Sequence, residues 1–190
     1  MSVKGDSYSQ ELPPSQSAHR IRSMVLAALL AALTAASSLV AIPIGPVPIT
    51  LQSLFVLASG GILGPKWGAL SMCLYLAMGV AGLPVFAGGT TGFGKLLGPT
   101  GGYLIGFVLA SATVGLLTKS SSRLPRIFFS SLVGLSVIYI LGCGWLSLIA
   151  KIPLKKAIMV GLLPFVPGDL LKAFLASLLV VKWQAIQRGR

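Results

Sequence analysis

The chain has very few acidic residues and few charges of any kind. Only 3 of its 190 residues are Asp or Glu, and 9% are charged, whereas roughly a quarter of the residues in soluble domains are charged. Apolar residues make up 55% of the sequence. This composition excludes an ordinary soluble domain and predicts an all-α integral membrane protein embedded in a lipid bilayer.

Cysteine and histidine are equally scarce, with 2 Cys and 1 His. Cys73 and Cys143 each lie in the middle of an apolar segment, which predicts two small core residues rather than a disulfide or a metal pair. His19, the only histidine, belongs to a basic flank and has no partner ligands nearby. The sequence therefore predicts no metal site, no cofactor and no catalytic residues, because an intramembrane enzyme needs a nucleophile with a base or a metal cluster.

Basic residues are the exception, with 15 Lys and Arg. In a soluble protein this excess would suggest nucleic acid as a partner. In a membrane protein it is better explained by basic loops that orient helices against anionic lipid, so we predict no nucleic-acid binding.

Apolar segments divide the chain into a polar tail at 1–19, expected to be disordered, and one six-helix transmembrane domain at 20–190. The expected spans are 24–42, 49–63, 68–85, 98–117, 127–149 and 169–183. The second span is short, and Gly60 and Gly61 are expected to weaken it. An amphipathic segment at 151–163 is expected to lie in the membrane interface.

The distribution of charges orients these spans. One side would carry ten basic residues: Lys4, Arg20, Arg22, Lys66, Lys119, Arg123, Arg126, Lys182, Arg188 and Arg190. The other side would carry four: Lys95, Lys151, Lys155 and Lys156. The positive-inside rule then predicts that both termini are cytoplasmic. A proline-rich loop at 42–48, a glycine-rich loop at 87–95 and the starts of the fourth and sixth spans would converge on the outer face, as a ligand pocket requires.

Asp169 is the only carboxylate after Glu11, and Lys172 follows it on the same face of a helix that Pro167 and Gly168 introduce. The helix dipole favours a carboxylate in the first turn but opposes a lysine there. Helix stability alone therefore does not explain Lys172. The pair is either a ligand site or a mutually compensating ion pair at the membrane edge.

Three further patterns leave alternatives open. The stretch from Gly89 to Lys95 nearly matches a phosphate-binding loop, but Leu96 stands where Ser or Thr must hold magnesium, so we exclude nucleotide binding. Glycines there would instead let the backbone approach a ligand. Gln52 either caps its helix or faces a cavity.

The first span contains two rows of alanines, each with a spacing of four residues. One row is Ala27, Ala31 and Ala35, and the other, one position later, is Ala28, Ala32 and Ala36. Small residues at this spacing allow helices to approach closely in lipid. The rows serve either a partner protein or internal packing.

Four long motifs together resemble the BioY family, the biotin-specific substrate-binding (S) components of energy-coupling-factor (ECF) vitamin transporters. They are Ile44–Gln52, Gly82–Gly89, Leu97–Leu104 and Leu163–Lys172, and the similarity extends from about residue 20 to residue 182.

The resemblance implies a six-helix S-component fold in the cell membrane that captures biotin on the outer side. It also implies a transmembrane T component and two ABC-type ATPases as partners, with Ala27, Ala31 and Ala35 docking the T component. Alternatives are an S component for another small vitamin, or an intramembrane enzyme acting on a small anionic substrate.

The same resemblance implies which residues contact the ligand: Asp169, Lys172, Gln52, Gly88, Gly89, Thr90 and Tyr103. Biotin offers ureido N–H donors for a carboxylate and a valerate carboxylate for an ammonium, so Asp169 and Lys172 would be its polar anchors. Thr90 and Thr91 stand where we expect some family members to carry a basic residue.

Overall fold

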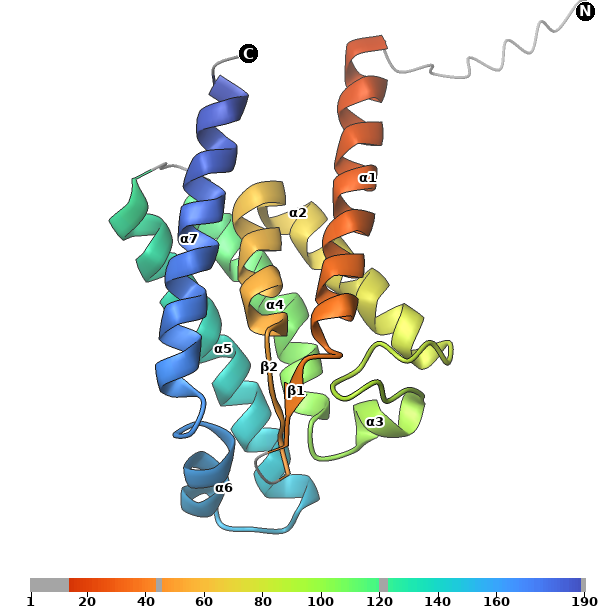
Figure 1. Cartoon of the computed structure of the whole chain (residues 1–190), viewed down its shortest axis with the longest axis vertical. Coiled ribbons are helices and arrows are strands. Elements are labelled where there is room, and N and C mark those ends of the chain that lie inside the picture. Colours follow the sequence, from red (N-terminus) through yellow and green to blue (C-terminus); the bar gives the residue numbers. More distant parts are fainter. Residues whose placement is uncertain (1–13, 44–45, 120–122, 189–190) are drawn as a thin grey trace, which may run out of the picture.

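A computed structural model describes residues 14–43, 46–119 and 123–188 of the chain. Seven helices and two short strands make up the described residues: α1 Pro14–Ser37, β1 Ala41–Ile42, β2 Ile49–Thr50, α2 Gln52–Val80, α3 Phe93–Leu97, α4 Gly101–Thr118, α5 Leu124–Ile149, α6 Leu154–Gly161 and α7 Val166–Arg188 (Figure 1). The predictions made for residues 1–13, 44–45, 120–122 and 189–190 lie outside the described residues.

Three helical stretches are long and apolar enough to cross a membrane, Ser17–Ser37, Gly101–Thr118 and Leu124–Ile149. The pair α6 and α7, bent by 58°, is a fourth candidate span. Large apolar side chains face outward, as at Ile140 and Leu148, which are 72% and 76% exposed. Apolar exteriors of this extent mark a surface that meets lipid or protein, in agreement with the predicted all-α membrane protein.

Helix α1 differs from the predicted first span at both ends. It begins at Pro14, inside the stretch expected to be a disordered tail, and ends at Ser37 rather than at residue 42. The hydroxyls of Ser37 and Ser38 bond back to the carbonyls of Thr34 and Ala35 at 2.7 Å each, and the chain then enters β1. Pro43 disfavours the helical conformation at Ile42, the predicted end of the span, because a residue before proline avoids that conformation.

Helix α2 is sharply kinked at Gly64, whose φ of +76° and ψ of −179° are not helical, and Pro65 follows. The predicted turn at 64–66 is thus confirmed, and it divides α2 into legs at 52–63 and 65–80. The second leg ends at Val80, short of the predicted residue 85, and a glycine-containing loop follows.

Gly60 and Gly61 do not weaken the first leg as expected. A Cβ atom on Gly60 would overlap the carbonyl oxygen of Ser111 in α4, and one on Gly61 would overlap the side chain of Val180 in α7. The two glycines therefore allow α2 to approach α4 and α7 closely, and their contribution is packing rather than weakness.

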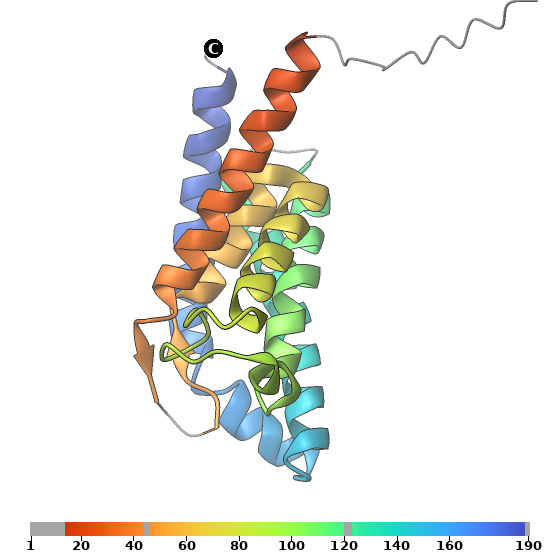
Figure 2. The ribbon, with the colours of Figure 1, turned by 90° about the vertical axis from the view of Figure 1, so that its right-hand side faces the viewer.

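The elements fall into two ends of the bundle. The first described turns of α1 and the last turns of α7 lie at one end with the kink of α2, the last turn of α4 and the first turn of α5 (Figures 1 and 2). The antiparallel β1–β2 pair, α3, α6 and the first turns of α4 and α7 lie at the opposite end. The convergence predicted from the sequence is therefore confirmed.

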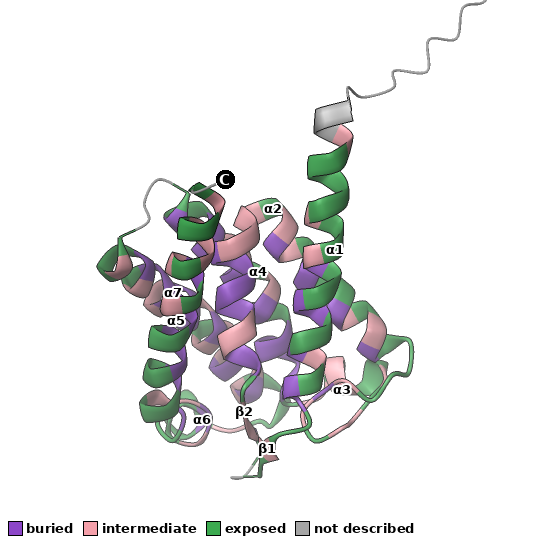
Figure 3. Ribbon diagram, turned by 45° about the horizontal axis from the view of Figure 1, so that its top comes forward, coloured by how far each residue is buried: buried purple, intermediate pink, exposed green. Residues whose placement is uncertain are grey.

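Burial varies strongly from helix to helix. Buried residues concentrate on α2, α4 and α5, whereas much of α1 and α7 is exposed (Figure 3). Helix α6 buries only Ala157 and Gly161 and leaves Leu154 and Met159 exposed. This is the short amphipathic helix expected at 151–163; its location in the membrane interface remains a prediction.

Candidate functional site

A pocket opens at the end of the bundle opposite the termini. Its empty space is about 610 Å³ when the open solvent at its mouth is counted. Its walls come from β2 and the segment before it, from the loop between α2 and α3, and from α2, α3, α4, α5 and α7 with the residues that precede α4 and α7. The lining residues are Val47, Pro48, Thr50, Gln52, Ser53, Phe86, Ala87, Lys95, Thr100, Tyr103, Leu104, Phe107, Ile138, Tyr139, Phe165, Asp169 and Lys172.

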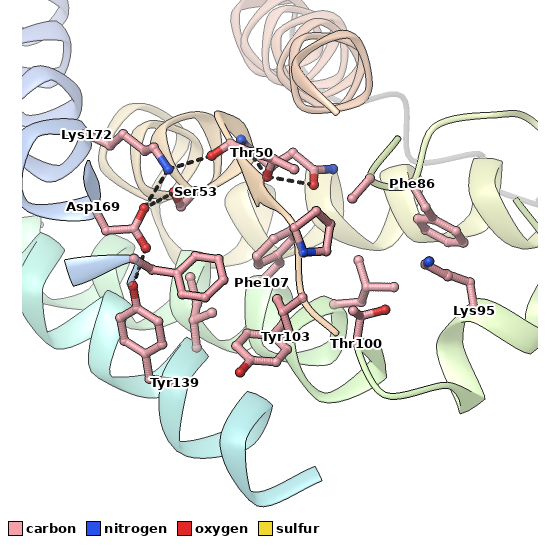
Figure 4. A pocket seen from close by; sticks show the side chains of 17 residues that line it. Thr50, Ser53, Phe86, Lys95, Thr100, Tyr103, Phe107, Tyr139, Asp169 and Lys172 are labelled. Carbon is pink, nitrogen blue, oxygen red and sulfur yellow. Dashed lines mark hydrogen bonds and ion pairs between the residues drawn. The ribbon is translucent and has the colours of Figure 1, made fainter. Parts of the chain in front are cut away.

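One end of the pocket is formed by the predicted ion pair. Lys172 Nζ donates to Asp169 Oδ1 at 2.7 Å and to the carbonyl oxygen of Thr50 at 2.5 Å (Figure 4). Ser53 Oγ donates to the same carboxylate oxygen at 2.9 Å, and the Tyr139 hydroxyl donates to Oδ2. Both charged residues are buried, with 6% and 7% of their surface exposed.

This network explains how two charges can be buried at the membrane. The carboxylate accepts three hydrogen bonds and the ammonium donates two, so each charge is compensated locally. Asp169, in the first turn of α7, and the carbonyl of Thr50 compensate the charge of Lys172, which lies about one turn further into the helix than predicted because α7 begins at Val166. Asp169 and Lys172 therefore form a mutually compensating ion pair, which was one alternative. They also face a pocket, which the other alternative, a ligand site, required.

Gln52 belongs to the wall beside this network. Its Nε2 donates to the Tyr75 hydroxyl at 2.6 Å, and its Oε1 accepts from Thr50 Oγ1 at 3.1 Å. The residue before α2, Leu51, provides no side-chain cap. Of the two alternatives for Gln52, facing the cavity is correct and capping the helix is wrong.

Aromatic rings line the middle of the pocket. Tyr103 presents its ring, because its hydroxyl already donates to the carbonyl oxygen of Gly161 at 2.9 Å. Phe86 is fully buried and packs edge-on against Tyr75, with ring centroids 5.8 Å apart. Phe107 and Phe165 complete this apolar section. Rigid rings of this kind suit a ligand with a flat or aliphatic body.

Gly88, Gly89 and Thr90 do not line the pocket, in contrast to the expectation. Gly88 and Gly89 adopt φ values of +73° and +71°, and Phe86 and Thr90 pair across the turn that they form. The N–H of Gly88 donates to the carbonyl of Ser38 at 3.0 Å, at the end of α1. These residues build a tight turn that places Phe86 in the wall, which is the reason for their conformational freedom.

Thirteen of the seventeen lining residues were not predicted as ligand contacts, among them the polar residues Ser53, Tyr139, Lys95 and Thr100. Ser53 and Tyr139 are partners of Asp169, and the need of a buried carboxylate for donors was the available signal. Lys95 lies across the pocket from Asp169 (Figure 4), and its ammonium makes no hydrogen bond or ion pair with the described residues. It lies in α3, four residues after Thr91, and not at the positions of Thr90 and Thr91, where some family members were expected to carry a basic residue.

The two alanine rows of α1 have different surroundings. Ala27 and Ala31 are buried, and Ser71 in α2 donates to the carbonyl oxygen of Ala27 at 2.7 Å. Ala35 is half-buried and packs against the core. This row therefore packs internally against the chain's own helices, which is one of the two alternatives that its spacing left open.

The second row, Ala28, Ala32 and Ala36, is rotated by about 100° around α1 from the first row and is exposed. It leaves α1 with a smooth outer face of small residues between exposed leucines.

Residues 9–188 match the sequence profile of the BioY family. The chain is 39% identical over 170 residues to the biotin transporter BioY of Thermotoga maritima, covering 90% of this chain and 100% of that protein. It is 41% identical over 165 residues to the probable biotin transporter BioY of Pyrococcus horikoshii, covering 87% and 98% of the two chains.

A solved structure gives the same result. The crystal structure of the S component for biotin from an ECF-type ABC transporter superposes with a TM-score of 0.84 at 32% identity, covering 92% of this chain and 95% of that chain.

Proposed function

The chain belongs to the BioY family, and we propose that it captures biotin as the S component of an ECF-type ABC transporter. The observation that carries this proposal is the two-ended pocket. A hydrogen-bonded ion pair lies at one end, aromatic rings line the middle, and an unpaired ammonium lies at the other end. A compact ligand with a polar ring, an apolar body and an anionic tail carries its groups in the same order as these three parts of the pocket.

The ureido ring of biotin suits the end formed by Asp169 and Lys172. The two side chains are 2.7 Å apart, so they serve one end of a ligand rather than two. A ureido group presents N–H donors beside a carbonyl acceptor, and it can therefore donate to the carboxylate and accept from the ammonium together. Hydrogen bonds to charged groups are the stronger kind.

The valerate carboxylate is then assigned to Lys95. This ammonium faces the pocket from α3 and is not neutralised by any described acidic residue, since Asp169, the only acidic residue in the described part of the chain, is at the other end. An anionic tail would supply the missing partner. The bicyclic ring and the tail would lie along the aromatic section.

We further propose that the protein crosses the cell membrane six times, through α1, the two legs of α2, α4, α5 and α7, with both termini in the cytoplasm. The basic excess at the end that carries the termini supports this orientation. The pocket would then open to the outside, where a vitamin is captured.

A T component and two ABC-type ATPases would supply transport energy, because this sequence contains no nucleotide-binding motif of its own. We place the docking face for the T component on Ala28, Ala32 and Ala36, the exposed row of α1. Close approach of helix backbones through small residues is the main way in which helices associate in lipid.

Calorimetric titration of the purified protein with biotin, thiamine and riboflavin tests the proposal. We expect saturable binding of one biotin per chain and no binding of the other two vitamins, because neither presents a ureido ring opposite a carboxylate. Binding of thiamine or riboflavin in place of biotin would assign the pocket to another vitamin. Chain with Lys155→Met, an exposed lysine outside the pocket, serves as the matched control.

A further inference from the structure

We infer that the hydroxyl of Thr100 is a hydrogen-bond donor to the carboxylate of the bound ligand and a determinant of specificity for an anionic tail. This inference rests on the proposed function, and it gives a ligand contact to a motif residue that was not predicted to have one.

The first observation is an unsatisfied buried hydroxyl. Thr100 is 9% exposed and lines the pocket, and its Oγ1 has no hydrogen-bond partner among the described residues. Buried polar groups are almost always paired, because an unpaired one loses its hydration without compensation. A hydroxyl in this condition on a pocket wall indicates a partner that arrives with the ligand.

The second observation is that the Thr100 side chain does not cap the N-terminus of α4. It is the N-cap residue of α4, where a threonine normally accepts a hydrogen bond from a backbone N–H of the first turn. Its φ of −92° and ψ of −4° are those of the helix itself, and no side-chain cap forms. The hydroxyl therefore has no structural task in α4, although the carbonyl of Thr100 accepts from the N–H groups of Tyr103 and Leu104 at 3.1 and 3.3 Å.

The position of Thr100 identifies the ligand group. In Figure 4, Thr100 lies between Tyr103 and Lys95, on the side of the pocket away from Asp169. It stands at the N-terminus of α4, an 18-residue helix whose dipole favours a negative charge there. The ammonium of Lys95 favours the same charge. A hydroxyl, a helix N-terminus and an ammonium together form a site for a carboxylate.

Binding of two ligands to two variants tests the inference. Thr100→Val keeps the shape of the side chain and removes the hydroxyl, whereas Thr100→Ser keeps the hydroxyl. The ligands are biotin and biotinamide, whose tail carries no charge. We expect Thr100→Val to bind biotin about ten to a hundred times more weakly, as for a lost hydrogen bond to a charged group. Thr100→Ser should bind biotin nearly as the parent does, and Thr100→Val should bind biotinamide nearly as the parent does.

Thermal unfolding without ligand separates this role from a structural one. Because the hydroxyl is unpaired, Thr100→Val should unfold at the same temperature as the parent or higher, while a structural hydroxyl would lower that temperature when removed. Combining Thr100→Val with Lys95→Met should cost less affinity for biotin than the sum of the two single losses, since both groups hold one carboxylate.

The possible failures are distinguishable. Parent-like biotin binding by Thr100→Val, or equal losses for biotin and biotinamide, would overturn the assignment of Thr100 while leaving biotin capture intact. A lower unfolding temperature of ligand-free Thr100→Val would overturn it in favour of a structural hydroxyl. Failure of the parent itself to bind biotin would overturn the proposed function, and this inference with it.

Discussion

Asp169 and Lys172 show how one pair of residues can carry both stability and recognition. Each is buried and hydrogen-bonded to the protein, yet both border the pocket. The network joins α7 to β2, α2 and α5 through Thr50, Ser53 and Tyr139. A ligand that binds here meets charges that are already held in place, so little side-chain ordering is required on binding.

Removing either charge should weaken both properties. We expect Asp169→Asn and Lys172→Met each to reduce biotin affinity by about 2–5 kcal/mol, because the remaining charge stays buried without its partner. For the same reason each should destabilise the fold by about 3–5 kcal/mol. Calorimetric titration and thermal unfolding in detergent measure the two effects.

The double variant distinguishes the two contributions. Asp169→Asn combined with Lys172→Met leaves no unpaired charge, so it should recover much of the stability and none of the affinity. If the double variant, once folded, bound biotin as tightly as the parent, the pair would be structural only.

At the scale of elements, α1 presents one alanine row to the protein and one to its surroundings. Ala31 is fully buried, whereas Ala32, the next residue, is exposed. The two positions have the same side chain and lie in the same helix, so they form a matched pair for separating folding from docking.

Tryptophan at these two positions should have opposite effects. Ala31→Trp overfills the contact with α2 and should lower thermal stability and biotin binding together. Ala32→Trp should keep biotin binding but hold a partner helix away, so that the T component and ATPases no longer co-purify and uptake is lost. Full uptake by Ala32→Trp would remove this row from the docking face.

The close contact of α2 with α4 depends on Gly60. Because a Cβ there meets the backbone of Ser111 rather than a flexible side chain, Gly60→Ala should destabilise the protein by about 1–3 kcal/mol, as overpacking does. Gly144→Ala in α5, where a Cβ meets nothing within 4 Å, should leave the unfolding temperature nearly unchanged. Equal shifts for the two variants would show that lost glycine flexibility, and not the contact, is responsible.

At the scale of the whole molecule, the pocket and the termini lie at opposite ends of the bundle. If the termini are cytoplasmic, a cysteine at Lys156 should react with a membrane-impermeant maleimide added to intact cells. A cysteine at Lys66 should react only after the cells are permeabilised. Both lysines are exposed, and exposed Cys73 is first replaced by Ala. The reverse pattern of labelling would invert the topology.

Ligand protection should also follow the whole-molecule arrangement. Val47 is buried in the pocket wall, whereas Thr91 is exposed and lies outside the wall. In the Cys73→Ala background, biotin should slow the labelling of Val47→Cys and leave that of Thr91→Cys unchanged. Slower labelling at both positions would show that the glycine-rich loop closes over the ligand after all.

The sequence by itself determined the features that depend on local composition. Apolar runs marked the helices, because a chain in lipid must pair its backbone within each segment. Gly64 and Pro65 marked the kink of α2, and the position of Asp169 and Lys172 after Pro167 marked the polar end of the pocket. The family motifs, being long and ordered, indicated the ligand.

Only the tertiary structure decided features that depend on how distant segments meet. The rotation of α1 placed Ala31 inside and Ala32 outside, which two rows of identical side chains cannot reveal. The packing of α3 and α4 against the rest brought Lys95 and Thr100 into the pocket and left Gly88 in a turn beside it. Which side chain faces the pocket, the core or the surroundings depends on how closely neighbouring helices pack. The residue pattern of a single helix carries no information about that packing.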